Sequence, residues 1–209
     1  VKLPFTIHHM NEEFYYTISQ PVVAEFKDRG SRFLAYAYPL VSVDEFKAKM
    51  KLLKDEHPKA VHHCFAYRLG TDGNTFRVSD DGEPSGSAGR PILGQIDSKQ
   101  LTNILVVVVR YFGGTLLGVP GLINAYKTAA TLALQTTPII QKQIEVNYQL
   151  HFDYTRMNDV MMIVKQYNCN VVKQEQNLFC DVEISIPKNR LEEVLFKLGE
   201  MHTVETRKL

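Results

Sequence analysis

The 209-residue chain has the composition of an ordinary globular protein, with 44% hydrophobic and 22% charged residues. This balance excludes disordered, collagenous and disulfide-scaffold proteins. The net charge of +1, with the histidines neutral, indicates only weak non-specific attraction to nucleic acid. The longest aliphatic run is far shorter than the ~18 apolar residues of a membrane-spanning helix. Three cysteines without C-x-x-C spacing indicate free thiols, so we expect a cytoplasmic protein with no secretory signal and no membrane partner.

The first part of the chain predicts an α+β layer in which helices pack on a sheet. Ser42 and Glu45 have the spacing of a capping box at a helix start. The run 104–111 is apolar on both faces, which predicts a central strand. The expected strands are 21–26, 31–38, 61–69 and 104–111, and the expected helices run from Ser42 to Pro58 and from Gly118 to Gln135.

The second part of the chain predicts the order β-α-β-β-α-β, which is the ferredoxin-like arrangement. Asp153 is placed to cap the first helix, and Asn189 with Glu192 has the spacing of a capping box at the second. The expected strands are 146–152, 170–175, 178–186 and 203–207. Because a helix pattern ends at 136–138, we expect an α+β protein of two domains, residues 1–138 and 139–209.

Ten of the twelve glycines lie between Gly70 and Gly121. The first glycine-rich segment, residues 79–91, offers small residues that let a phosphate or nucleic-acid backbone approach closely. Its carboxylates repel anions and suit a metal ion or acid-base chemistry. The third interpretation is a structural loop in which Asp and Ser side chains cap turns and the next helix. The candidate ligand-binding residues in this segment are Asp80, Asp81, Glu83, Ser85, Ser87 and Arg90.

The second glycine-rich segment, residues 110–121, follows the buried strand and opens a helix, where anions often bind. Val119 and Pro120 stand where a P-loop needs Lys and Ser or Thr, which excludes that kind of nucleotide hydrolysis. No G-x-G-x-x-G is present, so Rossmann-type nicotinamide binding is excluded. The alternatives are an anion at the helix N-terminus and close packing of the helix on the sheet; the candidate residues are Arg110, Gly113, Gly114 and Gly118.

Catalytic patterns are sparse. His62 and Cys64 share one side of a strand, but a Cys–His nucleophile also needs hydrogen-bond reach and a lowered pKa, and most free cysteines are buried small hydrophobes. Zinc-ligand spacing is absent from the sequence. We therefore expect no catalytic residue, no metal and no cofactor.

Several of these segments together resemble the YigZ/Impact family: residues 31–33, 63–68 (HCFAYR), 79–93 (SDDGEPSGSAGRPIL) and 110–114 (RYFGG). The resemblance implies a first domain of the ribosomal protein S5 domain 2-like class and a second domain similar to the last, ferredoxin-like domain of translocating elongation factors. It departs at Leu116 and Asn124, where the family pattern often has basic residues. The remaining candidates for phosphate pairing are Arg32, Arg68, Arg90 and Arg110.

The family resemblance implies a role in translation. Eukaryotic Impact proteins carry an additional N-terminal domain and act as regulators of translational control under stress. We do not expect that domain here, so partner binding through it is not implied. Bacterial members are inferred to bind nucleic acid or the ribosome. We therefore expect a non-enzymatic factor that binds RNA or the ribosome. The alternatives are an enzyme acting on a phosphate-containing ligand and a regulator that binds only protein partners in translation control.

Overall fold

The computed structural model describes residues 13–209, which form two compact units. The first unit is Tyr15–Lys142, and the second contains Gln143–Leu209 together with residues 13–14. None of the helices in the described part of the chain has the length and apolar character to cross a membrane.

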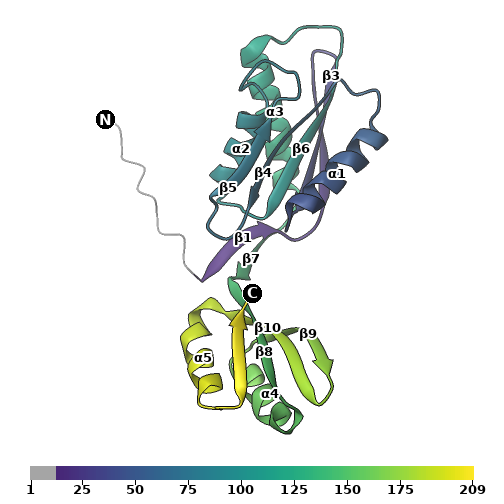
Figure 1. Cartoon of the computed structure of the whole chain (residues 1–209). Coiled ribbons are helices and arrows are strands. Elements are labelled where there is room, and N and C mark those ends of the chain that lie inside the picture. Colours follow the sequence, from purple (N-terminus) through teal and green to yellow (C-terminus); the bar gives the residue numbers. More distant parts are fainter. Residues whose placement is uncertain (1–12) are drawn as a thin grey trace, which may run out of the picture. The chain divides into compact units, whose positions relative to one another are not determined.

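A five-stranded antiparallel sheet forms the centre of the first unit (Figure 1). Its strands are β2 (Val22–Asp28), β3 (Ser31–Pro39), β4 (His62–Leu69), β5 (Thr75–Ser79) and β6 (Ile104–Tyr111). The spatial order is β2-β3-β6-β4-β5, so β6 is the central strand, as its apolar sequence predicts. Every pair of neighbouring strands is antiparallel.

Helices cover both faces of this sheet, which explains why residues 104–109 of β6 are all apolar. They are α1 (Val43–Glu56), α2 (Gly89–Ser98) and α3 (Gly118–Gln135). Leu105, Val107 and Val109 belong to a core cluster with the buried residues of α1. Ile104, Val106 and Val108 point to the other face, where the core cluster includes α2 and α3 (Figure 1). The alternation of a strand therefore divides β6 between two hydrophobic cores.

The predicted capping of α1 is confirmed. The Ser42 hydroxyl accepts a hydrogen bond from the Glu45 amide at 3.1 Å. The Glu45 carboxylate accepts one from the Val41 amide at 3.0 Å, one residue before the cap. The two bonds satisfy amides at and beside the start of the helix, where no backbone carbonyl is in reach.

Strands β1 (Phe14–Ile18) and β7 (Ile139–Gln143) pair in a separate two-stranded sheet. The sequence predicts neither strand. Both are only five residues long, and four of the five residues of β7 are exposed. A strand without a buried face leaves no alternation of apolar and polar residues to detect.

The second unit has the predicted element order β-α-β-β-α-β (Figure 1). The elements are β8 (Glu145–Asp153), α4 (Met157–Gln166), β9 (Asn170–Gln176), β10 (Phe179–Pro187), α5 (Leu191–Gly199) and β11 (Val204–Lys208). The sheet order is β11-β8-β10-β9, with every neighbouring pair antiparallel. Both helices share one core cluster with β8 and β10, which leaves the other face of the sheet without a covering helix.

One of the two predicted helix caps in the second unit is wrong. Asp153 accepts a hydrogen bond from the Thr155 amide at 2.9 Å, as predicted, and caps a 3-10 turn that leads into α4. The box at Asn189 does not form, because a 3-10 turn covers 188–190 and α5 begins only at Leu191. The Asn189 amide instead contacts Gln143 and Glu13, each at 3.3 Å.

Candidate functional site

The two glycine-rich loops lie at the same end of the five-stranded sheet. The first connects β5 to α2, and the second connects β6 to α3. Arg110, at the end of β6, is the register partner of His62 on β4. Arg68 is the register partner of Ile104, six pairs further along, which is about 20 Å at the usual strand rise. The structure thus brings Arg110 to the loops and places Arg68 at the opposite end of the sheet.

Arg110 forms a buried ion pair with Glu83. The Arg110 Nη1 donates to Glu83 Oε1 at 2.6 Å, and the two side chains are only 6% and 4% exposed. The guanidinium carbon lies 5.4 Å from the Phe33 ring centroid and 5.6 Å from that of Phe112. The sequence predicts that Arg110 pairs with a ligand phosphate; in the structure its charge is already neutralised by a residue of the other loop.

Other buried polar groups complete the surroundings of this ion pair. The Tyr126 hydroxyl of α3 donates to Glu83 Oε1 at 2.7 Å, and the Cys64 thiol donates to that hydroxyl at 3.3 Å. The Ser31 hydroxyl accepts from Arg110 Nη2 at 3.4 Å. We call these five residues, Ser31, Cys64, Glu83, Arg110 and Tyr126, the Glu83 cluster. It links β3, β4, β6, α3 and the first loop, which gives it a structural role.

Asp80 occupies the N-terminus of α2. Its carboxylate accepts from the backbone amides of Gly86 at 2.8 Å, Ala88 at 3.0 Å and Gly89 at 2.8 Å. Burial acts to raise the pKa of Asp80, but these hydrogen bonds and the charge of Arg90 outweigh it, so the pKa lies below its ordinary value. The loop amides that the sequence offers to a phosphate are therefore satisfied by the chain's own carboxylate.

We expect Asp80→Asn to lower the free energy of unfolding by about 1–2 kcal/mol at pH 7, because an amide group accepts fewer of the three bonds and carries no charge toward the helix dipole. A carboxyl whose pKa is depressed by folding stabilises the protein above its unfolded pKa and loses this effect as the pH falls. The wild type should therefore lose stability below about pH 4 more steeply than the variant. Urea denaturation at pH 7, 5 and 3.5 measures both effects, and parallel pH profiles would contradict the assignment.

Asp81 is committed to β4. Its carboxylate Oδ2 accepts from the His63 amide at 2.6 Å, and its carbonyl oxygen lies 2.7 Å from His62 Nδ1. Burial is the main reason that the pKa of His63 lies below its ordinary value. Within residues 13–209, no three His, Cys, Asp or Glu side chains are grouped as metal ligands.

Cys64 lacks the environment of a nucleophile. The thiol is fully buried, and burial is the main cause that raises its pKa well above the ordinary value. Both nitrogens of the His62 ring face other groups: Nδ1 lies 2.7 Å from the Asp81 carbonyl oxygen, and Nε2 lies 3.8 Å from Glu83 Oε1. A thiol that stays protonated is inert toward electrophiles.

The second loop is shaped by a close backbone contact. Gly113 lies against Gly30 of the β2–β3 turn, and a Cβ atom on Gly113 would stand 1.9 Å from the Gly30 carbonyl carbon. The Gly113 amide donates to the Ser31 hydroxyl at 3.2 Å. Gly114 and Gly118 have φ of +84° and +69°, values that favour glycine. The α3 N-terminus has no side-chain cap.

The remaining candidate residues divide into buried and exposed ones. Ser87 is fully buried, and its hydroxyl has no hydrogen-bond partner in the described part of the chain. Ser85 and Arg90 are exposed. Arg68 is half-buried, with its Nε 2.6 Å from Asp97 and a further hydrogen bond from Nη1 to the Gly73 carbonyl. Arg32 is exposed and paired with Glu25 at 2.7 Å. Of the four predicted arginines, Arg32, Arg68 and Arg90 therefore reach solvent, and only Arg110 is buried.

A hollow of about 390 Å³ lies between β5 and α2. The sequence does not identify this hollow, because the bounds of β5 and α2 are not predicted from it. The signal that was available is Phe76, an aromatic residue among polar ones in a short strand. The lining residues are Phe76, Val78, Arg90, Leu93, Gly94 and Asp97.

Comparison with known proteins decides the family. The model of the Impact N-terminal domain matches residues 29–134, which include both glycine-rich loops. This chain belongs to the YigZ/Impact family. An IMPACT family member of Haemophilus influenzae is 36% identical over 77% of this chain and 79% of its own length. The IMPACT family member YigZ of Escherichia coli is 31% identical over 86% of this chain and 89% of its own.

Solved structures extend the comparison to both units of this YigZ/Impact protein. The crystal structure of a hypothetical protein, 29% identical, matches with a TM-score of 0.74 and covers 94% of this chain and 98% of that one. A structure described as the two-domain translational regulator Yih1 is 30% identical, covers 58% of this chain and 47% of its own, and has a TM-score of 0.35.

Proposed function

We propose that this chain is a non-enzymatic cytoplasmic factor that binds RNA or a ribosomal surface and regulates translation. The observation that carries the proposal is Arg90, an exposed cation at the end of the first loop with no ion-pair partner among residues 13–209. It stands beside a hollow that contains an exposed aromatic ring. Cations and aromatic rings are the groups that contact phosphates and unpaired bases.

The same proposal assigns structural roles to most of the glycine-rich segment. Asp80 and Arg110 satisfy groups of the chain itself, so phosphate contacts would come from the exposed side chains of this segment, Arg90 and Ser85. The enzyme alternative has less support, because Asp80 and the Oε1 atom of Glu83 both accept hydrogen bonds from the chain itself.

The two units are proposed to belong to the folds that the family resemblance implies. The β-α-β-β-α-β order and the sheet order of the second unit support a ferredoxin-like assignment. The antiparallel sheet of the first unit, with helices on both faces, supports the ribosomal protein S5 domain 2-like class.

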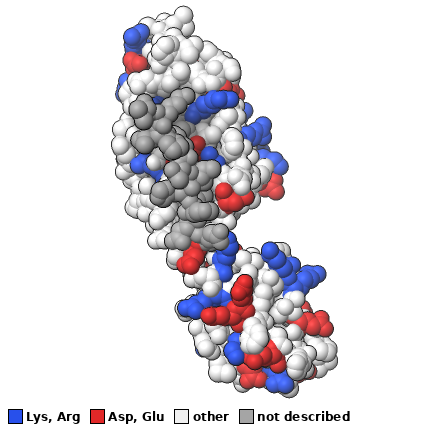
Figure 2. Space-filling model, turned by 90° about the vertical axis from the view of Figure 1, so that its left-hand side faces the viewer, with Lys and Arg blue, Asp and Glu red and all other residues white. Residues whose placement is uncertain are grey.

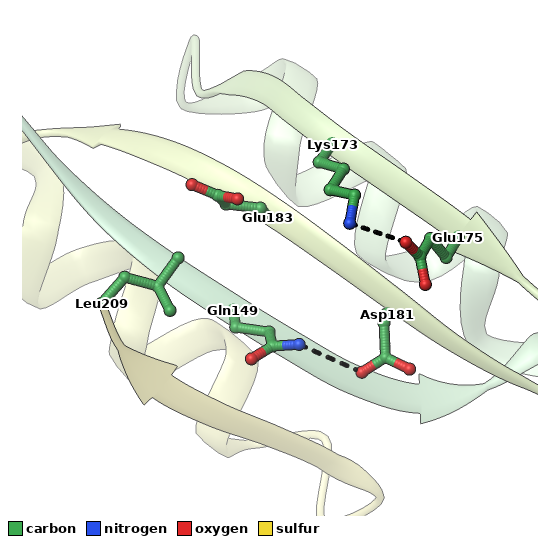
Figure 3. A pocket seen from close by; sticks show the side chains of 6 residues that line it. All are labelled: Gln149, Lys173, Glu175, Asp181, Glu183 and Leu209. Carbon is green, nitrogen blue, oxygen red and sulfur yellow. Dashed lines mark hydrogen bonds and ion pairs between the residues drawn. The ribbon is translucent and has the colours of Figure 1, made fainter.

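The charges on the open face of the second unit make this face a poor site for RNA. The open face of the second sheet carries Glu175, Asp181 and Glu183 beside Lys173, and Figure 3 shows these side chains around one shallow pocket. Lys173 is paired with Glu175 at 2.6 Å, and Arg207 lies on the same face, 2.8 Å from Gln149 Oε1. The three carboxylates still outnumber these two cations, which disfavours phosphate. On the visible face in Figure 2, basic and acidic side chains are interspersed in the second unit. Mixed charges of this kind on the second unit support the second candidate function, binding of a protein partner in translation control.

Arg90→Ala is expected to weaken RNA binding for all sequences and to reduce the slope of log K against log salt by about 1, because one phosphate contact is lost. Filter binding of a structured ribosomal RNA fragment at four salt concentrations measures this. The matched control is Lys51→Ala on α1, since α1 covers the opposite face of the sheet.

An affinity that does not depend on salt, or an equal effect of both substitutions, would overturn the phosphate contact at Arg90. Partner capture that survives nuclease treatment, together with no RNA binding by the purified chain, would favour the protein-binding function.

A further inference from the structure

The hollow between β5 and α2 has the form of a small binding site on one edge of the sheet. β5 is the last strand in the order, so it has a strand neighbour on one side only. Val78 and Leu93 provide an apolar floor, and Gly94 adds no side chain there. Arg90 and Asp97 are seven residues apart on α2, which is about 10 Å along a helix. The hollow therefore has an apolar middle and opposite charges on its helical side.

Phe76 is held in position although it is 53% exposed. The guanidinium carbon of Arg68 lies 5.2 Å from its ring centroid, within the range of a cation–π contact. Arg68 itself is fixed by Asp97, 2.6 Å from its Nε, and by the Gly73 carbonyl. An ordered, half-exposed ring beside an apolar floor offers a stacking surface that needs little reorganisation.

The charges at the two ends of the hollow determine which way a bound anionic ligand would lie. Asp97 is engaged by Arg68, and its negative charge disfavours a phosphate at that end. Arg90 has no ion-pair partner in the described chain and is exposed at the other end. A ligand that combines a flat ring with one anionic group matches these features, and the volume of about 390 Å³ lies within the range of small-molecule sites.

We propose that this hollow binds one nucleotide of single-stranded RNA, with the base stacked on Phe76 and an adjacent phosphate paired with Arg90. The inference rests on the proposed RNA-binding function and assigns it a site. Aromatic stacking accepts any base, because every base has a π face. The site thus reads an unpaired nucleotide and no particular sequence.

The test uses fluorescence anisotropy with the full chain and a labelled single-stranded oligoadenylate of ten nucleotides. Phe76→Ala should weaken binding at least fivefold, and about tenfold is expected from the loss of one stacked base. Phe76→Tyr should bind like the wild type, because the ring is retained. Phe196→Ala, which removes an exposed aromatic ring from α5 of the second unit, should have no effect.

A direct readout is available because the chain has no tryptophan. Phe76→Trp introduces a single indole, whose emission should be quenched when a base stacks on it. Unchanged emission under conditions where anisotropy reports full binding would overturn the site. The circular dichroism spectrum of the free variant shows whether it is folded.

The outcomes separate the site from the function on which it rests. If the wild type binds neither the oligonucleotide nor structured RNA at low salt, the proposed function fails. If the wild type binds RNA and Arg90→Ala weakens it while Phe76→Ala does not, the function stands and the nucleotide site is wrong. If only paired RNA competes for binding, recognition of an unpaired base is wrong.

Discussion

Replacing Glu83 with Ala is expected to lower the free energy of unfolding by about 3–5 kcal/mol, because it leaves the buried Arg110 charge without a partner. The two side chains are 6% and 4% exposed, so water cannot take the place of the lost carboxylate without opening the loop. The Tyr126 hydroxyl loses its acceptor in the same change. Guanidinium denaturation monitored by circular dichroism measures the loss.

The effect of Glu83 can be separated from a general effect of removing a carboxylate. Glu25→Ala breaks the exposed contact with Arg32 at 2.7 Å, and we expect only a small change because surface ion pairs contribute little. The double variant Glu83→Leu, Arg110→Met removes both charges and should recover part of the stability. A loss at Glu83 no larger than that at Glu25 would show that the ion pair does not stabilise the fold.

Gly113→Ala is expected to destabilise the first unit by about 3 kcal/mol, at the upper end of the range for overpacked sites. The added Cβ would lie 1.9 Å from the Gly30 carbonyl carbon and 2.2 Å from the Ser31 amide nitrogen. Both are backbone atoms of the β2–β3 turn, so no side-chain rotation relieves the clash. The loop must move, which also displaces the amide that donates to Ser31.

Gly94→Ala is the matched control for this prediction. Gly94 lies inside α2, and a Cβ there meets no atom within 4 Å. Alanine is the better helix former, so this variant should gain about 0.5–1 kcal/mol. Thermal or chemical denaturation of both variants gives the comparison. Equal effects at the two positions would contradict the packing role of Gly113.

The sequence predicts the regular elements that have strong periodic patterns. The bounds of β6 and α3 agree with the expected 104–111 and 118–135, since β6 begins with six consecutive apolar residues and α3 has a clear helical stripe of apolar residues. A helix after the first loop, capped by an Asp or Ser of that loop, is one of the predicted interpretations, but its bounds are not predicted because α2 begins Gly89-Arg90-Pro91, which favours a turn by composition. Its amides are satisfied by Asp80, nine residues before Gly89, and no local capping pattern signals this. Pro91 fits because a proline in the first turn needs no hydrogen-bond donor.

The candidate site is predictable in its location and less so in its chemistry. The glycine-rich segments identify both loops, because their backbone geometry depends on local sequence. The pairing of Glu83 with Arg110 joins residues 27 positions apart and requires the sheet order that brings the two loops together. Burial then decides which charges face solvent, and burial follows from the tertiary structure rather than from any local sequence pattern. Hence Arg90 and Arg110 look equivalent in the sequence and differ in the structure.

The burial of the Glu83 cluster has a consequence for ionic strength. Dissolved ions screen charges that they can approach, and at 0.15 M salt this screening acts over about 8 Å in water. Glu83 and Arg110 are enclosed by protein, so added salt leaves their attraction nearly intact. The loops should therefore keep their shape throughout a salt titration. The attraction of the exposed Arg90 for a phosphate becomes weaker as the salt concentration rises. Any salt-dependent change in affinity then reports the surface charge and not a rearrangement of the site beneath it.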